Sequence, residues 1–195
     1  MAEGFRLYFL VYYGLGIVVA LITVATDYLR SAPVGQRPEG AGRHLLPLLV
    51  LVMLLLPPSL IFVRAGEIEA EWVPVRILGV AMTLYTAGME LWVATALGRF
   101  LVARAVVFQD HALITQGPYR FLRHPDYSGL LALWLGAGLG SLNGWLVMLF
   151  PLFVIGLSME ARLEERLLES KFGETYRVYA YGKRRFVPQL GVRAL

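Results

Sequence analysis

The sequence predicts an all-α membrane protein: a polytopic helical bundle of about five transmembrane helices, with a C-terminal helical hairpin, a cytoplasmic connecting segment and C-terminal helices. Two observations predict this class. The 195 residues are 57% hydrophobic and only 16% charged, with a mean hydropathy of +0.61, whereas soluble domains are about 25% charged. Uncharged runs of helix-spanning length also recur along the chain. No internal repeat or composition shift divides residues 1–195, so we expect a single domain.

The uncharged runs predict where the chain crosses the bilayer. Three of them have 19 to 22 residues, enough to span about 30 Å of hydrocarbon, and the third contains a single acid, Glu90: 7–26, 45–63 and 77–98. The fourth run, 127–159, is too long for one crossing and short of two. A helical hairpin turning at 140–144 fits it, with arms of about 16 residues, or about 24 Å, that continue into charged sequence.

The orientation follows from Lys and Arg, which are preferentially retained on the cytoplasmic side. With the N-terminus outside, 15 of the 18 basic residues lie on the cytoplasmic side, and the acidic stretch 67–71 lies outside. We therefore expect a multi-pass protein of a bacterial or archaeal inner membrane whose C-terminus is cytoplasmic. The first apolar run lacks a basic preceding region and a small-residue cleavage site, so it predicts a retained helix.

Composition also excludes several classes of site and partner. The absence of Cys excludes disulfides, thiolate metal sites and a cysteine nucleophile, and we expect no metal. Basic residues flank the predicted spans and form no separate stripe, so nucleic acid is a poor partner. The net charge of +4 suits anionic lipid headgroups, and the bilayer itself is the expected partner.

Local signals organise the second half of the chain. We expect 99–115 to be an irregular connection that ends in a turn at 116–118. Pro125 is typical of the first turn of a helix. The second arm of the hairpin should continue to Lys171, stop at Gly173 and be followed by a short helix.

Polar residues with chemical potential concentrate in two segments of this half, 110–127 and 163–179. The first contains His111-Ala112-Leu113-Ile114, Gly117-Pro118-Tyr119 and Arg123-His124-Pro125-Asp126-Tyr127-Ser128-Gly129, and the second contains Glu164-Glu165-Arg166-Leu167-Leu168, Phe172-Gly173 and Tyr176-Arg177-Val178-Tyr179. Singly these motifs are not specific, because a sequence such as EARLEER is also typical of a solvated helix face with ion pairs. Their order and spacing together resemble the isoprenylcysteine carboxyl methyltransferase family, integral membrane enzymes that use S-adenosylmethionine and are related to phospholipid methyltransferases.

This resemblance implies a methyltransferase whose cofactor is S-adenosylmethionine, with S-adenosylhomocysteine as product. It implies three membrane helices in 1–98 and a cofactor-binding catalytic half in 99–195, with the active site on the cytoplasmic side. Tyrosine rings suit the sulfonium and adenine, carboxylates suit the ammonium and ribose, and His suits the carboxylate. The cofactor-binding residues expected from the motifs are His111, Ala112, Leu113, Ile114, Gly117, Tyr119, His124, Pro125, Asp126, Tyr127 and Glu164.

The remaining candidates concern the methyl acceptor and the transfer step. We expect Glu165 and Arg162 to be catalytic, with Glu165 or His124 accepting a proton if the acceptor is an amine. Three residues are expected to bind the acceptor: Glu90, Arg123 and Glu160. Glu160 stands where family members commonly have Arg, and Arg162 lies about 200° around the helix from it. Glu90 is an intramembrane acid, which is typically functional or paired with a nearby Arg.

The predicted function is therefore methyl transfer from S-adenosylmethionine to a lipophilic acceptor. The preferred acceptor is a prenylcysteine-type or other small carboxylate, which would be O-methylated. Two alternatives remain open within the enzyme class: N-methylation of a phospholipid amine and S-methylation of a small thiol. A non-enzymatic alternative is a membrane scaffold or lipid-binding protein, which the Glu at position 160 favours. The sequence does not predict the oligomeric state.

Overall fold

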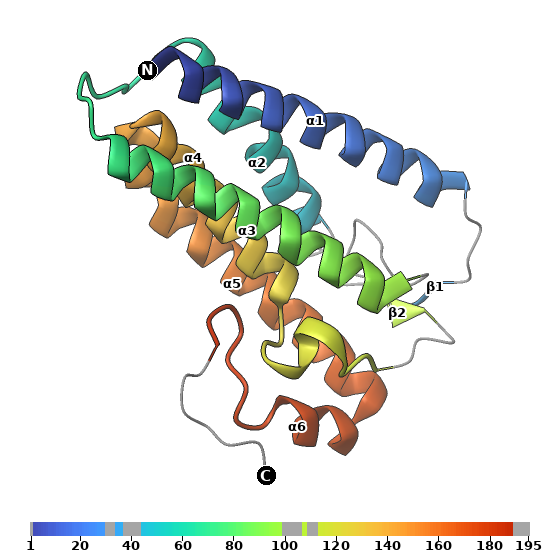
Figure 1. Cartoon of the computed structure of the whole chain (residues 1–195). Helices are drawn as coiled ribbons and strands as arrows, with labels where there is room; N and C mark the ends of the chain where they lie inside the picture. Colours follow the sequence, from blue (N-terminus) through green and yellow to red (C-terminus); the bar gives the residue numbers. More distant parts are fainter. Residues whose placement is uncertain (1, 30–33, 37–43, 99–106, 109–112, 189–195) are drawn as a thin grey trace.

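A computed structural model describes residues 2–29, 34–36, 44–98, 107–108 and 113–188. Its elements in chain order are α1 (Ala2–Leu29), β1 (Val34–Gln36), α2 (Leu45–Phe62), α3 (Val73–Leu97), β2 (Val107–Phe108), the 3-10 turn η3 (Gly117–Arg120), α4 (Pro125–Ser141), α5 (Gly144–Phe172) and α6 (Glu174–Ala180). Figure 1 shows the helices α1 to α5 running alongside one another, with α6 beyond the lower end of α5. The predicted all-helical bundle is confirmed.

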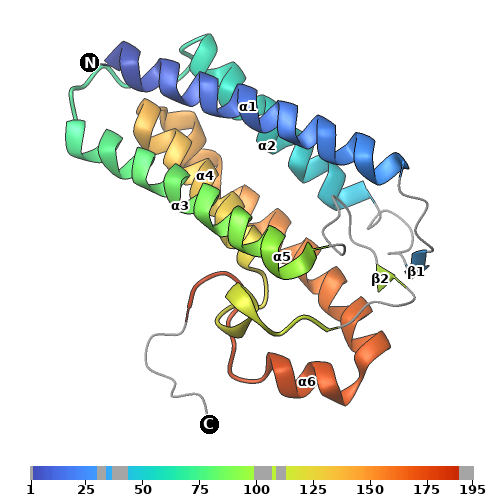
Figure 2. The ribbon, with the colours of Figure 1, turned by 45° about the vertical axis from the view of Figure 1, so that its right-hand side comes forward.

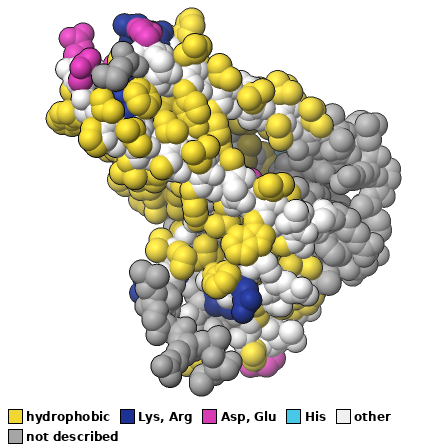
Figure 3. Space-filling model, viewed as in Figure 1, with side chains coloured by type: hydrophobic (Ala, Val, Ile, Leu, Met, Phe, Trp, Pro, Cys, Tyr) yellow, Lys and Arg dark blue, Asp and Glu magenta, His cyan; other side chains and the backbone are white. Residues whose placement is uncertain are grey.

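Apolar sequence forms helices here because a backbone in hydrocarbon has no water to bond and must satisfy its amides internally. Among the described residues, four helices are long and apolar enough to cross a membrane: α1, α2, α3 and α5. Figure 3 shows apolar side chains over the helices, with charged groups gathered toward the two ends of the bundle. The long apolar surface and its charged ends are those of a multi-pass membrane protein.

The fourth of the five predicted spans, α4, differs from the others. It has only 17 residues, about 25 Å, because Pro125 opens it and the turn at Leu142 and Asn143 ends it. Eleven of its residues are buried, so its neighbours cover most of it. Figure 2 shows α4 lying between α3 and α5. α4 is the central helix, and the helices that surround it provide the apolar outer surface.

Close packing of α3 on α4 depends on glycine. A Cβ atom on Gly79 would lie 2.3 Å from the backbone nitrogen of Gly140, so only glycine lets the two backbones approach so closely. On the other side of the same turn, Phe9 of α1 occupies the space where a Gly140 side chain would lie. Small residues at such crossings are typical of membrane helix pairs.

The predicted hairpin is confirmed, and its turn is held by two buried side chains. Asn143 caps α5 by accepting a hydrogen bond from the Leu146 amide at 3.2 Å and donates to the Ala65 carbonyl at 2.9 Å. Trp134 of α4 donates to the Leu146 carbonyl at 2.8 Å and stacks on Phe153 with ring centroids 4.5 Å apart. These contacts hold the two helices of the hairpin in a defined register.

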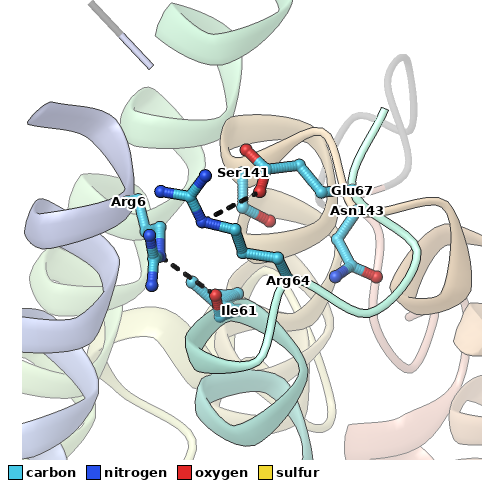
Figure 4. A pocket seen from close by; sticks show the side chains of 6 residues that line it. All are labelled: Arg6, Ile61, Arg64, Glu67, Ser141 and Asn143. Atoms are coloured by element: carbon cyan, nitrogen blue, oxygen red, sulfur yellow. Dashed lines mark hydrogen bonds and ion pairs between the residues drawn. The ribbon is translucent and has the colours of Figure 1, made fainter. Parts of the chain in front are cut away.

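The lower end of α5 also agrees with the sequence. α5 runs through the charged segment to Phe172, Gly173 ends it with a φ of 53°, and α6 follows. The segment 99–115 was expected to be irregular, but 107–108 pairs antiparallel with 34–36, and 99–106 and 109–112 lie outside the described residues. At the opposite end of the bundle, Arg6, Arg64 and Glu67 surround a cavity of about 10 Å³ beside Asn143, with room for about one water (Figure 4).

Candidate functional site

The candidate site lies at the end of the bundle where α4 begins and the charged part of α5 continues. His124 precedes α4 and is 3% exposed. Its Nδ1 lies 3.3 Å from Glu164 and its Nε2 lies 3.1 Å from Glu165. The imidazole thus bridges two adjacent carboxylates that lie 40 and 41 residues further along the chain.

The charge on His124 follows from these contacts. An imidazole offers two donors only when it is protonated, and both of its nitrogens face carboxylates here. Burial lowers the pKa of His124, but the hydrogen bonds to Glu164 and Glu165 outweigh that effect and raise the pKa to about 9. At neutral pH His124 is therefore a cation between two anions.

Aromatic rings complete one wall of this cluster. The Tyr127 ring stacks on His124 with centroids 5.2 Å apart and planes 9° apart, and its hydroxyl donates to Glu164 at 3.2 Å. Phe186 packs against both rings, with centroids 6.3 Å from each. The spacing of three residues between His124 and Tyr127 places both at the first turn of α4, so Pro125 at the helix start positions the pair.

Glu165 is held by three cations. Arg185 donates to its two oxygens at 3.0 and 2.6 Å, a bidentate arrangement, and Arg123 lies 3.0 Å from Oε1. His124 is the third. These contacts engage most of the lone pairs of Glu165, which makes it a weak proton acceptor and weighs against the role of base predicted for it.

The segment after α6 closes over the start of the site. Backbone amides of Arg123 and His124 donate to the carbonyls of Arg184 and Arg185, both at 3.0 Å. The Tyr179 hydroxyl donates to the Tyr119 carbonyl at 2.9 Å, and the Lys183 ammonium lies 3.7 Å from the centre of the Tyr179 ring. Sequence analysis missed Arg185 and Phe186. The basic run Lys183-Arg184-Arg185 is evident in the sequence, but no local pattern indicates that Arg185 pairs with Glu165.

Two buried carboxylates near this cluster have unpaired oxygens among the described residues. Both oxygens of Glu160 lack a hydrogen-bond partner, and its side chain is fully buried one helical turn before Glu164. Oε1 of Glu90 on α3 is also buried and unpaired, and it lies 2.9 Å from the position of a Cβ on Gly129. The Nε of Arg123 is a further buried polar atom without a hydrogen-bond partner. The cluster thus presents unpaired carboxyl and N–H donor groups.

A groove of about 310 Å³ lies at the end of α3. It is lined by Trp92, Thr95, Ala96 and the segment 113–117, which includes Leu113, Ile114 and Gly117. Gly117 has a φ of 59°, and a Cβ there would lie 3.0 Å from Ala96, so glycine is needed at this position. Trp92 and the apolar side chains offer flat surfaces for a planar ring.

The structure therefore brings many of the predicted residues to one end of the bundle, in two adjoining groups. His124, Tyr127, Glu164, Glu165 and Arg123 form the charged cluster, while Leu113, Ile114 and Gly117 line the groove. Pro125 and Asp126 form the first turn of α4, and the Tyr119 carbonyl joins the turn η3 to the closing segment.

Two sets of predicted residues stand apart from these groups. His111 and Ala112 lie outside the described residues. Arg162 is exposed and lies with Arg166 in a second groove, which borders the charged cluster at Glu165 and Arg185. Its exposure follows from helix geometry, because two residues rotate a side chain about 200° from the buried face that Glu160 occupies.

Comparison with known proteins gives two findings. The model of the family described as phospholipid methyltransferase matches residues 74–175, slightly more than half of the chain and including α3, α4 and α5. Proteins of Oryza sativa subsp. indica and subsp. japonica, both named "Probable protein-S-isoprenylcysteine O-methyltransferase", are 32% identical over 117 residues. That alignment covers 58% of this chain and 61% of each relative, so the chain spans about three fifths of the length of these curated relatives.

Proposed function

The chain belongs to the phospholipid methyltransferase family, and from this premise we propose that it is a membrane enzyme that transfers a methyl group from S-adenosylmethionine to a lipophilic acceptor. The resemblance predicted from the motifs between His111 and Tyr179 is confirmed by these comparisons. The acceptor and the residue roles given below are part of the proposal.

One observation carries the proposal: the buried carboxylates of Glu90 and Glu160 have oxygens without partners. A buried carboxyl group without a counter-charge ionises only at high cost, and a bound cation offsets that cost. S-adenosylmethionine carries two positive charges, the sulfonium and the ammonium. The unpaired carboxyl groups therefore fit this cofactor, and the tyrosine rings of Tyr119 and Tyr127 add faces that attract cations.

The remaining residues would hold the other parts of the donor. Glu164 is oriented by the Tyr127 hydroxyl and by His124, and we assign it to the ammonium or the ribose hydroxyls. Trp92, Leu113 and Ile114 would take the adenine against their apolar surfaces. Bound there, S-adenosylmethionine supplies an electrophilic methyl group on a sulfonium. The chain's own contribution is to orient the reactants and to keep water away, since His124, Tyr127 and Glu160 are almost fully buried.

Two acceptors are each favoured by a different unpaired group. A prenylcysteine-type carboxylate, as in the printed name of the Oryza relatives, would be bound by the free Nε–H of Arg123. A phospholipid amine is favoured by Glu160, the carboxylate that stands where a basic residue was expected and that is free to accept a proton. We place the carboxylate first, because it needs no base and Glu165 is already saturated by cations.

The test is methyl transfer from radiolabelled S-adenosylmethionine by the purified full chain. N-acetyl-S-farnesylcysteine and phosphatidylethanolamine are offered in turn, and the products are identified by mass spectrometry. Label in the farnesylcysteine ester supports the first acceptor, and label in the lipid amine supports the second. Calorimetry with S-adenosylhomocysteine should show binding that Glu164→Gln abolishes and that Glu174→Gln, at an exposed acid of α6, leaves intact. If the unaltered chain did not bind S-adenosylhomocysteine, the proposal that it is a methyltransferase would be refuted.

A further inference from the structure

One face of α5 is exposed along the whole helix and changes from apolar to basic near its lower end. Side chains on it recur at alternating intervals of three and four residues, the period of one helical face. They are Trp145, Met148, Leu152, Ile155, Met159, Arg162 and Arg166, and all are exposed. We call the first five the apolar stripe of α5. The opposite face of the helix carries the buried Phe153, Leu157 and Glu160.

The change to basic residues coincides with the expected thickness of a bilayer. From Trp145 to Arg162 the helix rises about 25 Å, and to Arg166 about 32 Å, at 1.5 Å per residue. The hydrocarbon core is about 30 Å thick, and Trp is enriched at its boundary. With Trp145 at one boundary, the two arginines bracket the other, where lipid phosphates lie.

The two arginines line a groove suited to an anion. This groove, of about 500 Å³, is bounded by Met159, Arg162, Leu163, Glu165, Arg166, Glu169 and Arg185. Its acids are already neutralised: Glu165 pairs with Arg185 and Glu169 pairs with Arg177, each with a shortest contact of 2.6 Å. Neither Arg162 nor Arg166 has an ion-pair or hydrogen-bond partner in the described part of the chain. The groove therefore keeps two unused positive charges.

We propose that this groove binds the phosphate of a membrane phospholipid, with the acyl chains lying along the apolar stripe of α5. Guanidinium groups suit phosphate because their N–H donors match its oxygens in pairs. A lipid is preferred over free phosphate because the groove is continuous with the stripe through Met159. Glu165 and Arg185 lie between this groove and the proposed methyl-transfer site, while Arg162 and Glu160 point in directions about 200° apart around α5.

The test measures binding of dihexanoyl phosphatidylglycerol to the purified full chain in detergent, with inorganic phosphate and dihexanoylglycerol as separate probes. The double variant Arg162→Ala/Arg166→Ala is expected to weaken lipid binding about 25-fold, about fivefold for each lost charge. The conservative variant Arg162→Lys/Arg166→Lys should retain most of the affinity. Arg120→Ala/Arg184→Ala is the matched control, because it removes two exposed arginines at the same end of the molecule outside the groove.

Three outcomes would overturn the proposal. An equal loss of lipid affinity in Arg162→Ala/Arg166→Ala and Arg120→Ala/Arg184→Ala would show that the lipid is attracted by the overall positive charge and has no defined site. Inorganic phosphate binding as tightly as the lipid would show a free-anion site, and dihexanoylglycerol binding as tightly would show that the phosphate contributes nothing. Lipid binding that depends on Arg162 and Arg166 and exceeds the binding of both other probes supports the lipid site.

Discussion

The strongest electrostatic prediction concerns the protonation of His124. Its two ring nitrogens face Glu164 and Glu165, and the pKa is raised from 6.5 to about 9. Each unit corresponds to about 1.4 kcal/mol, so the charged form gains roughly 3 kcal/mol in the folded state. Because the folded pKa lies above the unfolded one, this stabilisation is complete below pH 6.5. It is lost as the pH rises toward 9.

The assay compares the unaltered chain with His124→Gln. Nuclear magnetic resonance of labelled histidine in detergent should show one imidazole that titrates near pH 9 and is absent from the variant. The melting temperature of the unaltered chain should exceed that of the variant by about 6 to 12 °C more at pH 6 than at pH 9.5, as expected for roughly 3 kcal/mol in a chain of this size. A His124 resonance that titrates at or below pH 6.5, or a difference that grows with pH, would refute the reasoning.

Three other changes test the site and the packing. Glu160→Gln should weaken binding of S-adenosylmethionine about tenfold while leaving S-adenosylhomocysteine, which lacks the sulfonium charge, nearly unaffected; calorimetry with both ligands measures this, and equal losses would contradict it. Gly79→Ala should destabilise the chain by about 1–3 kcal/mol, because the new methyl group meets the Gly140 backbone; an unchanged melting temperature would show that α3 and α4 can separate freely. Asn143→Ala should cost about 1–2 kcal/mol through the lost cap of α5 and the unpaired Ala65 carbonyl, whereas Asn143→Ser should keep the cap and lose the bond to Ala65. Melting in detergent separates these two variants.

Much of the helical architecture could be predicted from local sequence, with one instructive difference. The hairpin turn near Asn143, the start of α4 at Pro125 and the end of α5 at Gly173 all follow from local signals. The length of α4, 17 residues against a predicted arm of about 16, also followed, but its central position did not. The uncharged run 127–159 indicated two arms, but only packing shows that the first arm is the short central helix, since hydropathy does not distinguish lipid from a protein neighbour.

The site was predictable in its residue types and much less in its pairings. The motifs placed His124, Tyr127, Glu164 and Glu165 together, and helix periodicity alone separates Arg162 from Glu160. Arg185 could not be found in this way, because its partner Glu165 lies 20 residues earlier and is reached only after the chain turns back past α6. The same bond removes Glu165 from the candidates for proton transfer.

Local sequence is enough to predict that the chain forms apolar helices, where most of them begin and end, and at which end of the bundle the polar motifs gather. These features depend on backbone hydrogen bonding and on transfer of side chains to hydrocarbon, which act residue by residue. The pairing of charges, in contrast, depends on the three-dimensional packing of the helices. Glu165 is neutralised by three cations, while Glu160 and part of Glu90 are buried without a partner. The reason is that a charge finds its partner through the packing of distant segments, and on that packing depends which carboxylates remain free to act.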